Sequence, residues 1–161
     1  MNNFIGNFTG LDGRLNRQGW WISVIVLIIV AIVLNFILGL IMGGGMPSLE
    51  QMTDPAFMAG YAQKAAWQSL IVGVITAYPY IAISVKRRHD RNSNGYDAIG
   101  LIVVGLLYSL LQGLGVISST NTVGMIIGVI FGIYAIYMLI QLGFLKGTAG
   151  PNNYGPDPLQ G

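Results

Sequence analysis

The chain has 161 residues, of which 53% are hydrophobic and only 9% carry charge. A soluble domain carries charge on about a quarter of its residues, so this composition excludes one and predicts a single membrane domain over residues 1–161. The absence of cysteine excludes disulfides and thiol chemistry, and the net charge of +2 comes from too few basic residues to indicate a nucleic-acid partner.

The first long apolar run covers residues 20–42. As a helix it is long enough to cross the hydrocarbon core of a bilayer, which is about 30 Å thick. Trp20 and Trp21 stand at its start, where indole rings favour the headgroup level. The glycines at 43–45 and Pro47 end the run. It is too long for a secretory signal peptide, so we expect it to remain in the mature protein.

The second apolar run covers residues 65–85 and is also long enough to span. Between the two runs, residues 47–64 carry charges and predict a loop with a short interfacial helix. Asp54 and Pro55 could begin that helix, as N-cap and first helical residue. Pro79 lies inside the second run, so we expect a kink there.

The last uncharged stretch is too long for one crossing and fits two. We place span three at 98–117 and span four at 123–145, with a turn at the polar residues 118–121. A polar loop, 86–97, precedes span three. The tail, 146–161, is rich in Gly, Pro and Asn, and it predicts an irregular, turn-containing segment.

Lysines and arginines predict the orientation, because short loops that contain them stay on the cytoplasmic side. With four spans, only Lys64 falls on one side of the membrane. Both termini are therefore expected on the cytoplasmic side. The other seven basic residues all fall on that side: Arg14, Arg17, Lys86, Arg87, Arg88, Arg91 and Lys146.

The four predicted spans contain no Asp, Glu, Lys, Arg or His. An ionisable group at membrane depth is costly and marks an ion or proton path, so its absence argues against coupled transport. Passive conduction through an oligomer, along a path lined by Tyr, Gln and Asn side chains, stays open.

Three glycines in span four recur every four residues: Gly124, Gly128 and Gly132. Residues at this spacing share one helical face, and their missing side chains let another helix approach closely. The pattern predicts a packing seam. Its partner is another span of the same chain or a second protomer, and we favour the same chain.

The polar loop 86–97 holds most of the charged chemistry of the chain. One interpretation is that this loop is simply the positive-inside signal, with solvated cations attracted to anionic headgroups. His89 is the only histidine and Asp90 follows it, while arginine can clamp a phosphate or carboxylate. A catalytic His-Asp pair lacks an evident nucleophile, and one histidine among several cations is a poor metal site. No cofactor is predicted.

Two further elements face the same side as this loop. They are residues 13–21 and the tail, where Tyr154 offers an anchor and Asp157 a counter-ion. We expect the tail to fold back on the basic residues, with Asp157 or the carbonyls before it meeting Arg14, Arg17 or Arg87. The predicted fold is an all-α bundle of four transmembrane helices with a cytoplasmic cap made of the N-terminal segment, the basic loop and the C-terminal tail.

These three elements together resemble a family of small bacterial inner-membrane proteins, the domain of unknown function 805. The resemblance covers nearly the whole chain and implies an inner-membrane helical bundle, without bringing an activity. It departs in the second motif, where Tyr96 and Asp97 replace a Trp pair. The matching residues are Gly13, Arg14, Arg17, Trp20 and Trp21, then Arg87, His89, Asp90 and Gly95, then Gly150, Asn152, Tyr154, Gly155, Asp157 and Pro158.

We predict a non-enzymatic protein whose cap recognises an anionic lipid, a small anion or a protein partner. In this hypothesis the arginines donate hydrogen bonds to the anion, and His89 serves as a hydrogen-bonding or pH-sensing group. A small oligomeric transporter or channel is the alternative, and an enzyme acting on lipid headgroups comes third. Anionic lipids, a protein partner or a second copy are the expected partners. The predicted ligand-binding residues are Arg14, Arg17, Arg87, His89, Asp90, Asn152, Tyr154 and Asp157.

Overall fold

A computed structural model describes residues 4–43, 46–118 and 121–160. These residues form helices joined by short turns, and no strand occurs among them. The glycines at 44–45 and the polar residues at 119–120, which the sequence predicts as turns, lie outside the described residues. The elements are η1 (Phe4–Phe8), α1 (Arg17–Ile41), α2 (Leu49–Thr53), α3 (Pro55–Asp90), α4 (Tyr96–Gly113), α5 (Thr122–Leu139) and η2 (Ile140–Phe144).

Four helices of the described chain are long and apolar enough to cross a membrane: α1, α3, α4, and α5 with its continuation η2. This confirms the predicted all-α fold with four transmembrane helices. Span four agrees closely with its predicted limits, because α5 and the π-helical turn η2 together cover Thr122–Phe144. Span three begins earlier and ends earlier than predicted, at Gly113.

The second span is the element that the sequence described least well. Asp54 and Pro55 do begin a helix, and the Asp54 side chain accepts a hydrogen bond from the Ala56 N–H at 2.8 Å. That helix is not a separate interfacial one, because it continues unbroken as α3 to Asp90. The first five residues of the predicted polar loop are therefore helical. The separate short helix is α2, which begins with a capping box formed by Ser48 and Gln51.

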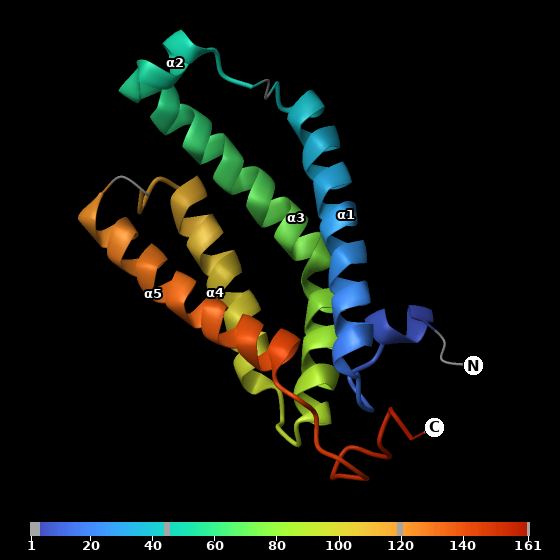
Figure 1. The fold of residues 1–161 in the computed structure, drawn as a ribbon. Helices are drawn as coiled ribbons and strands as arrows, with labels where there is room; N and C mark the ends of the chain where they lie inside the picture. The colour runs from blue at the N-terminus through green and yellow to red at the C-terminus, as the bar shows by residue number, and fades with distance from the viewer. Residues whose placement is uncertain (1–3, 44–45, 119–120, 161) are drawn as a thin grey trace.

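Helix α3 is the centre of the arrangement. It packs against α1 on one side and α4 on the other, while α5 packs on α4 (Figure 1). Figure 1 also shows that α3 changes direction partway along its length, and Pro79 lies inside it, as expected of a proline kink. Most of α1 and α5 exposes isoleucine, valine and leucine, which suits helices surrounded by lipid.

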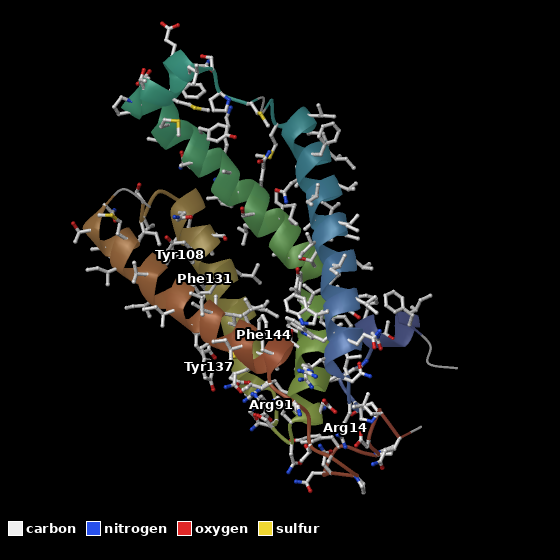
Figure 2. The ribbon with its side chains drawn as sticks, in the orientation of Figure 1. Arg14, Arg91, Tyr108, Phe131, Tyr137 and Phe144 are labelled. Carbon is white, nitrogen blue, oxygen red and sulfur yellow. The ribbon has the colours of Figure 1, made fainter. Side chains whose placement is uncertain are left out.

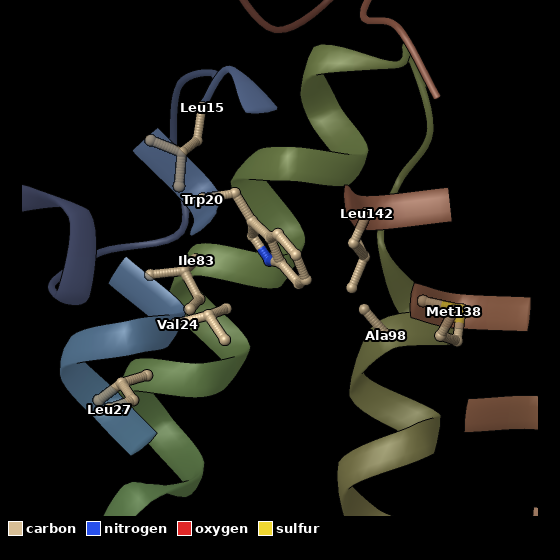
Figure 3. Close-up of a cluster of buried hydrophobic side chains, with 8 residues drawn as sticks. All are labelled: Leu15, Trp20, Val24, Leu27, Ile83, Ala98, Met138 and Leu142. Atoms are coloured by element: carbon tan, nitrogen blue, oxygen red, sulfur yellow. The ribbon is translucent and has the colours of Figure 1, made fainter. Parts of the chain in front are cut away.

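The buried core lies at one end of the bundle, where α1, α3, α4 and η2 converge. Figure 3 shows Trp20 reaching from α1 into the space toward Leu142. Because lipid provides no hydrophobic drive between helices, close packing and polar contacts at this end have to hold them together. The core side chains are Leu15, Trp20, Val24, Leu27, Ile83, Ala98, Met138 and Leu142.

The glycines of α5 differ in what lies against them. A Cβ added at Gly128 would lie 3.0 Å from the hydroxyl of Tyr108 in α4, and that hydroxyl donates to the Gly124 carbonyl at 3.3 Å. Gly124 also lies close to the Ser118 carbonyl. A Cβ at Gly132 would meet no atom within 4 Å. This chain therefore supplies close partners to Gly124 and Gly128, and none among its described residues to Gly132.

Candidate functional site

The cap is the polar end of the molecule. We use this name for residues 4–17, 86–95 and 145–160, which come from three parts of the sequence and lie together around the lower end of the bundle in Figure 1. Figure 2 shows Arg14 and Arg91 at this end, whereas Tyr108 and Phe131 lie farther along the α4–α5 pair. The three segments that were predicted to meet therefore do so.

Asp90 is the centre of the cap. Its Oδ1 accepts hydrogen bonds from Arg14 Nε at 3.1 Å and Arg14 Nη2 at 3.0 Å, and its Oδ2 accepts from Arg87 Nη1. The exposed fractions of the side chains are 5% for Asp90, 2% for Arg14 and 0% for Arg87. A buried carboxylate shared by two buried arginines leaves one positive charge, which needs further oxygen partners.

Backbone carbonyls at the end of span four supply many of those partners. The last carbonyls of a helix have no partner within it, and they carry the negative end of the helix dipole. Here each carbonyl from 141 to 145 accepts a side-chain N–H. The bonds run from Arg91 to Gln141 (3.3 Å), Arg87 to Leu142 (2.7 Å), Trp21 to Gly143 (3.0 Å), Arg17 to Phe144 (3.1 Å) and Arg87 to Leu145.

Arg87 is consequently a structural residue. All three of its side-chain nitrogens have partners inside the protein, and none of the side chain is exposed. An external anion would have to displace Asp90 or the carbonyls of span four. In this structure the Arg87 side chain joins α3 to the end of span four.

Lys86 holds the N-terminal segment in the same way. Its Nζ donates to the carbonyls of Gly6, Asn7 and Thr9, and its own carbonyl accepts from the Leu15 N–H at 3.1 Å. These bonds fix the short helix η1 beside α3. Lys86 is only 7% exposed, so its ammonium group is not accessible to an external ligand.

The tail folds back on Arg14 through backbone carbonyls that precede Asp157. This is one of the two contacts that the sequence predicted for the tail. Arg14 Nη1 donates to the carbonyls of Gly150 at 2.7 Å and Gly155 at 3.3 Å, and Nη2 donates to Thr148 at 2.6 Å. With the two bonds to Asp90, all five N–H groups of Arg14 are engaged. Arg14 is thus a tail anchor and has no donor left for a ligand.

His89 contacts the tail but does not pair with Asp90. Its ring stacks on Tyr154, with centroids 3.9 Å apart and planes 6° apart. Its Nδ1 lies 3.1 Å from the Gly13 carbonyl, which can only accept, so Nδ1 carries a proton. Asn152 Nδ2 donates to the His89 carbonyl at 2.9 Å. The geometry of a catalytic His-Asp pair is therefore not present.

Asp157 organises the tail itself. Its Oδ2 accepts from the Gly150 N–H at 2.9 Å and its Oδ1 from the Leu159 N–H at 3.0 Å. These two backbone hydrogen bonds, Leu159 first, lower the pKa of Asp157 below its ordinary value, and the charge of Arg14 acts in the same direction. The carboxylate is therefore ionised at neutral pH. It meets backbone N–H groups rather than an arginine side chain.

Two cations of the cap are left exposed beside apolar groups. Arg17 is exposed at the start of α1, and Lys146 is exposed just after η2. Phe144 is 58% exposed, its carbonyl accepts a hydrogen bond from Arg17, and its ring packs edge-on against Trp21 with centroids 5.9 Å apart. Cations next to exposed aromatic rings are typical of the level at which a protein meets lipid headgroups.

Two hollows adjoin this exposed strip. The larger, about 780 Å³ and here called the tail groove, lies between residues 4–22 and the tail, with Ile22, Tyr154 and Asp157 among its lining residues. The smaller, about 380 Å³, is the Arg17 hollow, lined also by Trp21, Gly143 and Leu159. Asn16 and Gln18 line both, so the two hollows are neighbours.

The structure therefore brings all eight predicted site residues into the cap but gives them different surroundings. Arg14, Arg87 and Asp90 form its buried centre, whereas Arg17 and Asp157 border hollows. Gln141, which was not among the predicted site residues, also contacts this region: its side chain accepts interhelical hydrogen bonds from Arg88 at 2.9 Å and from Arg91. Two further residues were not predicted as part of the site: Lys86, which holds the N-terminal segment, and Gly147, where an added Cβ would overlap the carboxylate of Asp90. The only sequence signal for Gln141 was a polar group at the end of an apolar span.

Comparison with known protein sequences identifies the family of the chain. The sequence profile of the family described as "Protein of unknown function (DUF805)" matches residues 8–156. The chain is 24% identical to the inner membrane protein YhaH of Escherichia coli K12 over 155 residues, which cover 94% of this chain and 89% of that one. The inner membrane protein YhaI is also 24% identical, over 96% of this chain and 91% of its own length.

A shorter match reaches higher identity. The uncharacterized protein YiiR of Escherichia coli K12 is 35% identical over 88 residues, and the chain spans 56% of the length of that relative. No solved structure matches the chain. The family match over most of the chain, together with four apolar helices, shows that this protein is an integral inner-membrane protein and a member of the DUF805 family.

Proposed function

We propose that this protein is a non-enzymatic membrane binding protein whose cap contacts anionic lipid headgroups through Arg17 and Lys146. The observation that carries the proposal is the difference in exposure among the cap cations. Arg14, Lys86 and Arg87 are committed to carboxylate and carbonyl oxygens within the protein. Arg17 and Lys146 are exposed, and both lie near Phe144: Arg17 donates to its carbonyl, and Lys146 follows it by two residues in the chain.

Elementary electrostatics supports this choice. A lysine or arginine at the surface of an anionic membrane contributes about 1 kcal/mol of attraction. Arg17 donates one N–H to the Phe144 carbonyl, and its other N–H groups can donate to a phosphate. The exposed Phe144 ring would enter the acyl region beside it, so that the cations stay at the phosphate level.

The proposal places the cap and both chain ends on the cytoplasmic side. The supporting feature is that seven of the eight lysines and arginines belong to the cap or the helix ends beside it. Since the chain has no cysteine, single cysteines can report the topology. We expect Glu50→Cys to react with a membrane-impermeant maleimide in spheroplasts, and Gln160→Cys to react only after lysis. The reverse pattern would refute the orientation.

Neutralising the two exposed cations tests the lipid contact. We expect the double variant Arg17→Gln with Lys146→Gln to bind phosphatidylglycerol about ten- to thirtyfold more weakly, because two attractions of about 1 kcal/mol are lost. Titration of the delipidated protein, read by native mass spectrometry, measures this. Lys64→Gln is the matched control, because Lys64 is an exposed cation of α3 distant from the cap in sequence and structure. Equal binding by all three proteins would end the proposal.

A further inference from the structure

The tail groove has free hydrogen-bond acceptors on its carboxylate, whereas the donors of its arginine are already engaged. Two charged residues of the described chain line it, and one of them, Arg14, has all five N–H groups engaged within the protein. Asp157 accepts only two hydrogen bonds, whereas a carboxylate offers about four lone-pair positions. The charge available to a ligand in the groove is therefore negative, and the group that fits it is a cationic hydrogen-bond donor.

The neighbouring Arg17 hollow has the opposite character. Its charged lining residue is Arg17, which is exposed and retains N–H groups beyond the one bonded to Phe144. Asn16 and Gln18 stand between the hollows because they line both. A ligand that lies across these two residues meets a carboxylate at one end and a guanidinium at the other.

We infer that the two hollows together bind the headgroup of a zwitterionic aminophospholipid, with its ammonium on Asp157 and its phosphate on Arg17. The inference rests on the proposed function, since it uses Arg17 as a phosphate contact, and it adds the class of headgroup. A primary ammonium satisfies the spare lone pairs of Asp157 by donating N–H bonds. A quaternary ammonium has the same charge but no N–H to donate.

A lipid fits this site better than a soluble phosphoethanolamine does. Ile22, on the first turns of the transmembrane helix α1, lines the tail groove and is 45% exposed. Trp21 lines the Arg17 hollow on the same helix. Both hollows thus run from polar groups of the cap onto the apolar surface of α1, where acyl chains lie.

Headgroup exchange in the wild-type protein is the direct test. We expect phosphatidylethanolamine to bind roughly fivefold more tightly than phosphatidylcholine with the same acyl chains, because only the former donates hydrogen bonds to Asp157. Native mass spectrometry of the delipidated full-length chain, with both lipids in competition, measures the ratio. Equal binding of the two lipids overturns the inference without any variant. Competition by soluble glycerophosphoethanolamine at the concentrations of the lipid would overturn the assignment to a lipid.

Variants then locate the contact. Asp157→Asn is expected to bring the ratio close to one, whereas Asp12→Asn, which changes an exposed cap carboxylate outside the two hollows, should leave it unchanged. Hydrogen exchange of residues 148–158 shows whether the tail stays docked in Asp157→Asn. A docked tail with the wild-type ratio refutes the inference. If the phosphatidylglycerol contact depends on Arg17 and Lys146 but no headgroup preference is found, this inference fails and the proposed function stands.

Discussion

Replacing Asp90 with asparagine is expected to lower the free energy of unfolding by about 3–5 kcal/mol and to release the tail from the cap. The substitution keeps the size of the side chain but removes the charge that Arg14 and Arg87 share. One amide oxygen remains as an acceptor, and the amide nitrogen is a donor that would face a guanidinium. Two buried arginines would then lack a counter-ion, which is the costly way to disrupt a buried ion pair.

The measurement is unfolding of the protein in detergent micelles, followed by hydrogen exchange of the tail amides in the folded state. Asp97→Asn is the matched control. Asp97 pairs with Arg88 at 2.6 Å, but the two side chains are 27% and 11% exposed. Solvent reaches that pair more than it reaches the Asp90 pair, so we expect its loss to cost less than the loss of Asp90. If the two variants were equally stable and kept the tail equally protected, Asp90 would not be the centre of the cap.

Gly147→Ala is expected to cost about 1–3 kcal/mol and to loosen the tail, with the spans left intact. A Cβ at this position would overlap the carboxylate of Asp90. Ordinarily a short acidic side chain could turn away, but both oxygens of Asp90 are held by arginines. The Asp90 carbonyl also accepts from the N–H and the hydroxyl of Thr148, each at 2.8 Å, so the tail backbone cannot shift freely.

Gly132→Ala is the control for this second substitution. An added Cβ there meets no atom within 4 Å, and alanine favours the helix over glycine by up to about 1 kcal/mol. We therefore expect unchanged or slightly higher stability for Gly132→Ala and a faster exchange of the tail amides for Gly147→Ala alone. Full protection of the tail in Gly147→Ala would show that the cap has room that the packing around Asp90 does not indicate.

The membrane-spanning part of the fold could be predicted from the sequence because lipid imposes a simple requirement. A segment that crosses must be apolar over about 20 residues and must satisfy its own backbone, so hydropathy alone locates it. The predicted spans at 20–42 and 123–145 correspond to helices for this reason. Helix α3 extends past the predicted span at 65–85 because Lys86, Arg87 and Asp90, which resemble a solvated loop in sequence, find partners in the folded chain. Arg87 pairs with Asp90, and Lys86 donates to carbonyls of the N-terminal segment.

The cap shows the limit of such reasoning. Its three motifs were identified and their meeting was expected, since all face the same side of the membrane. However, the sequence led us to predict that the arginines bind an external anion, because a sequence does not show which group a guanidinium contacts. Their partners are mostly backbone carbonyls at 141–145 and in the tail. Every residue has a carbonyl, and only the place where a helix ends in space leaves it unpaired beside a particular side chain.

For the same reason the sequence could not show that Arg17 is exposed whereas Arg14 and Arg87 are buried. In the sequence the three are equivalent members of two basic motifs. In the folded chain, Arg14 and Arg87 lie under the tail, and Arg17 lies at its edge next to Phe144. Composition and charge pattern were thus sufficient to predict the membrane location, the four apolar helices and the meeting of the three cap segments. Which cation is buried depends on contacts between residues far apart in the sequence, such as Arg14 with Gly150 and Arg87 with Leu142, and these form only when the chain is folded.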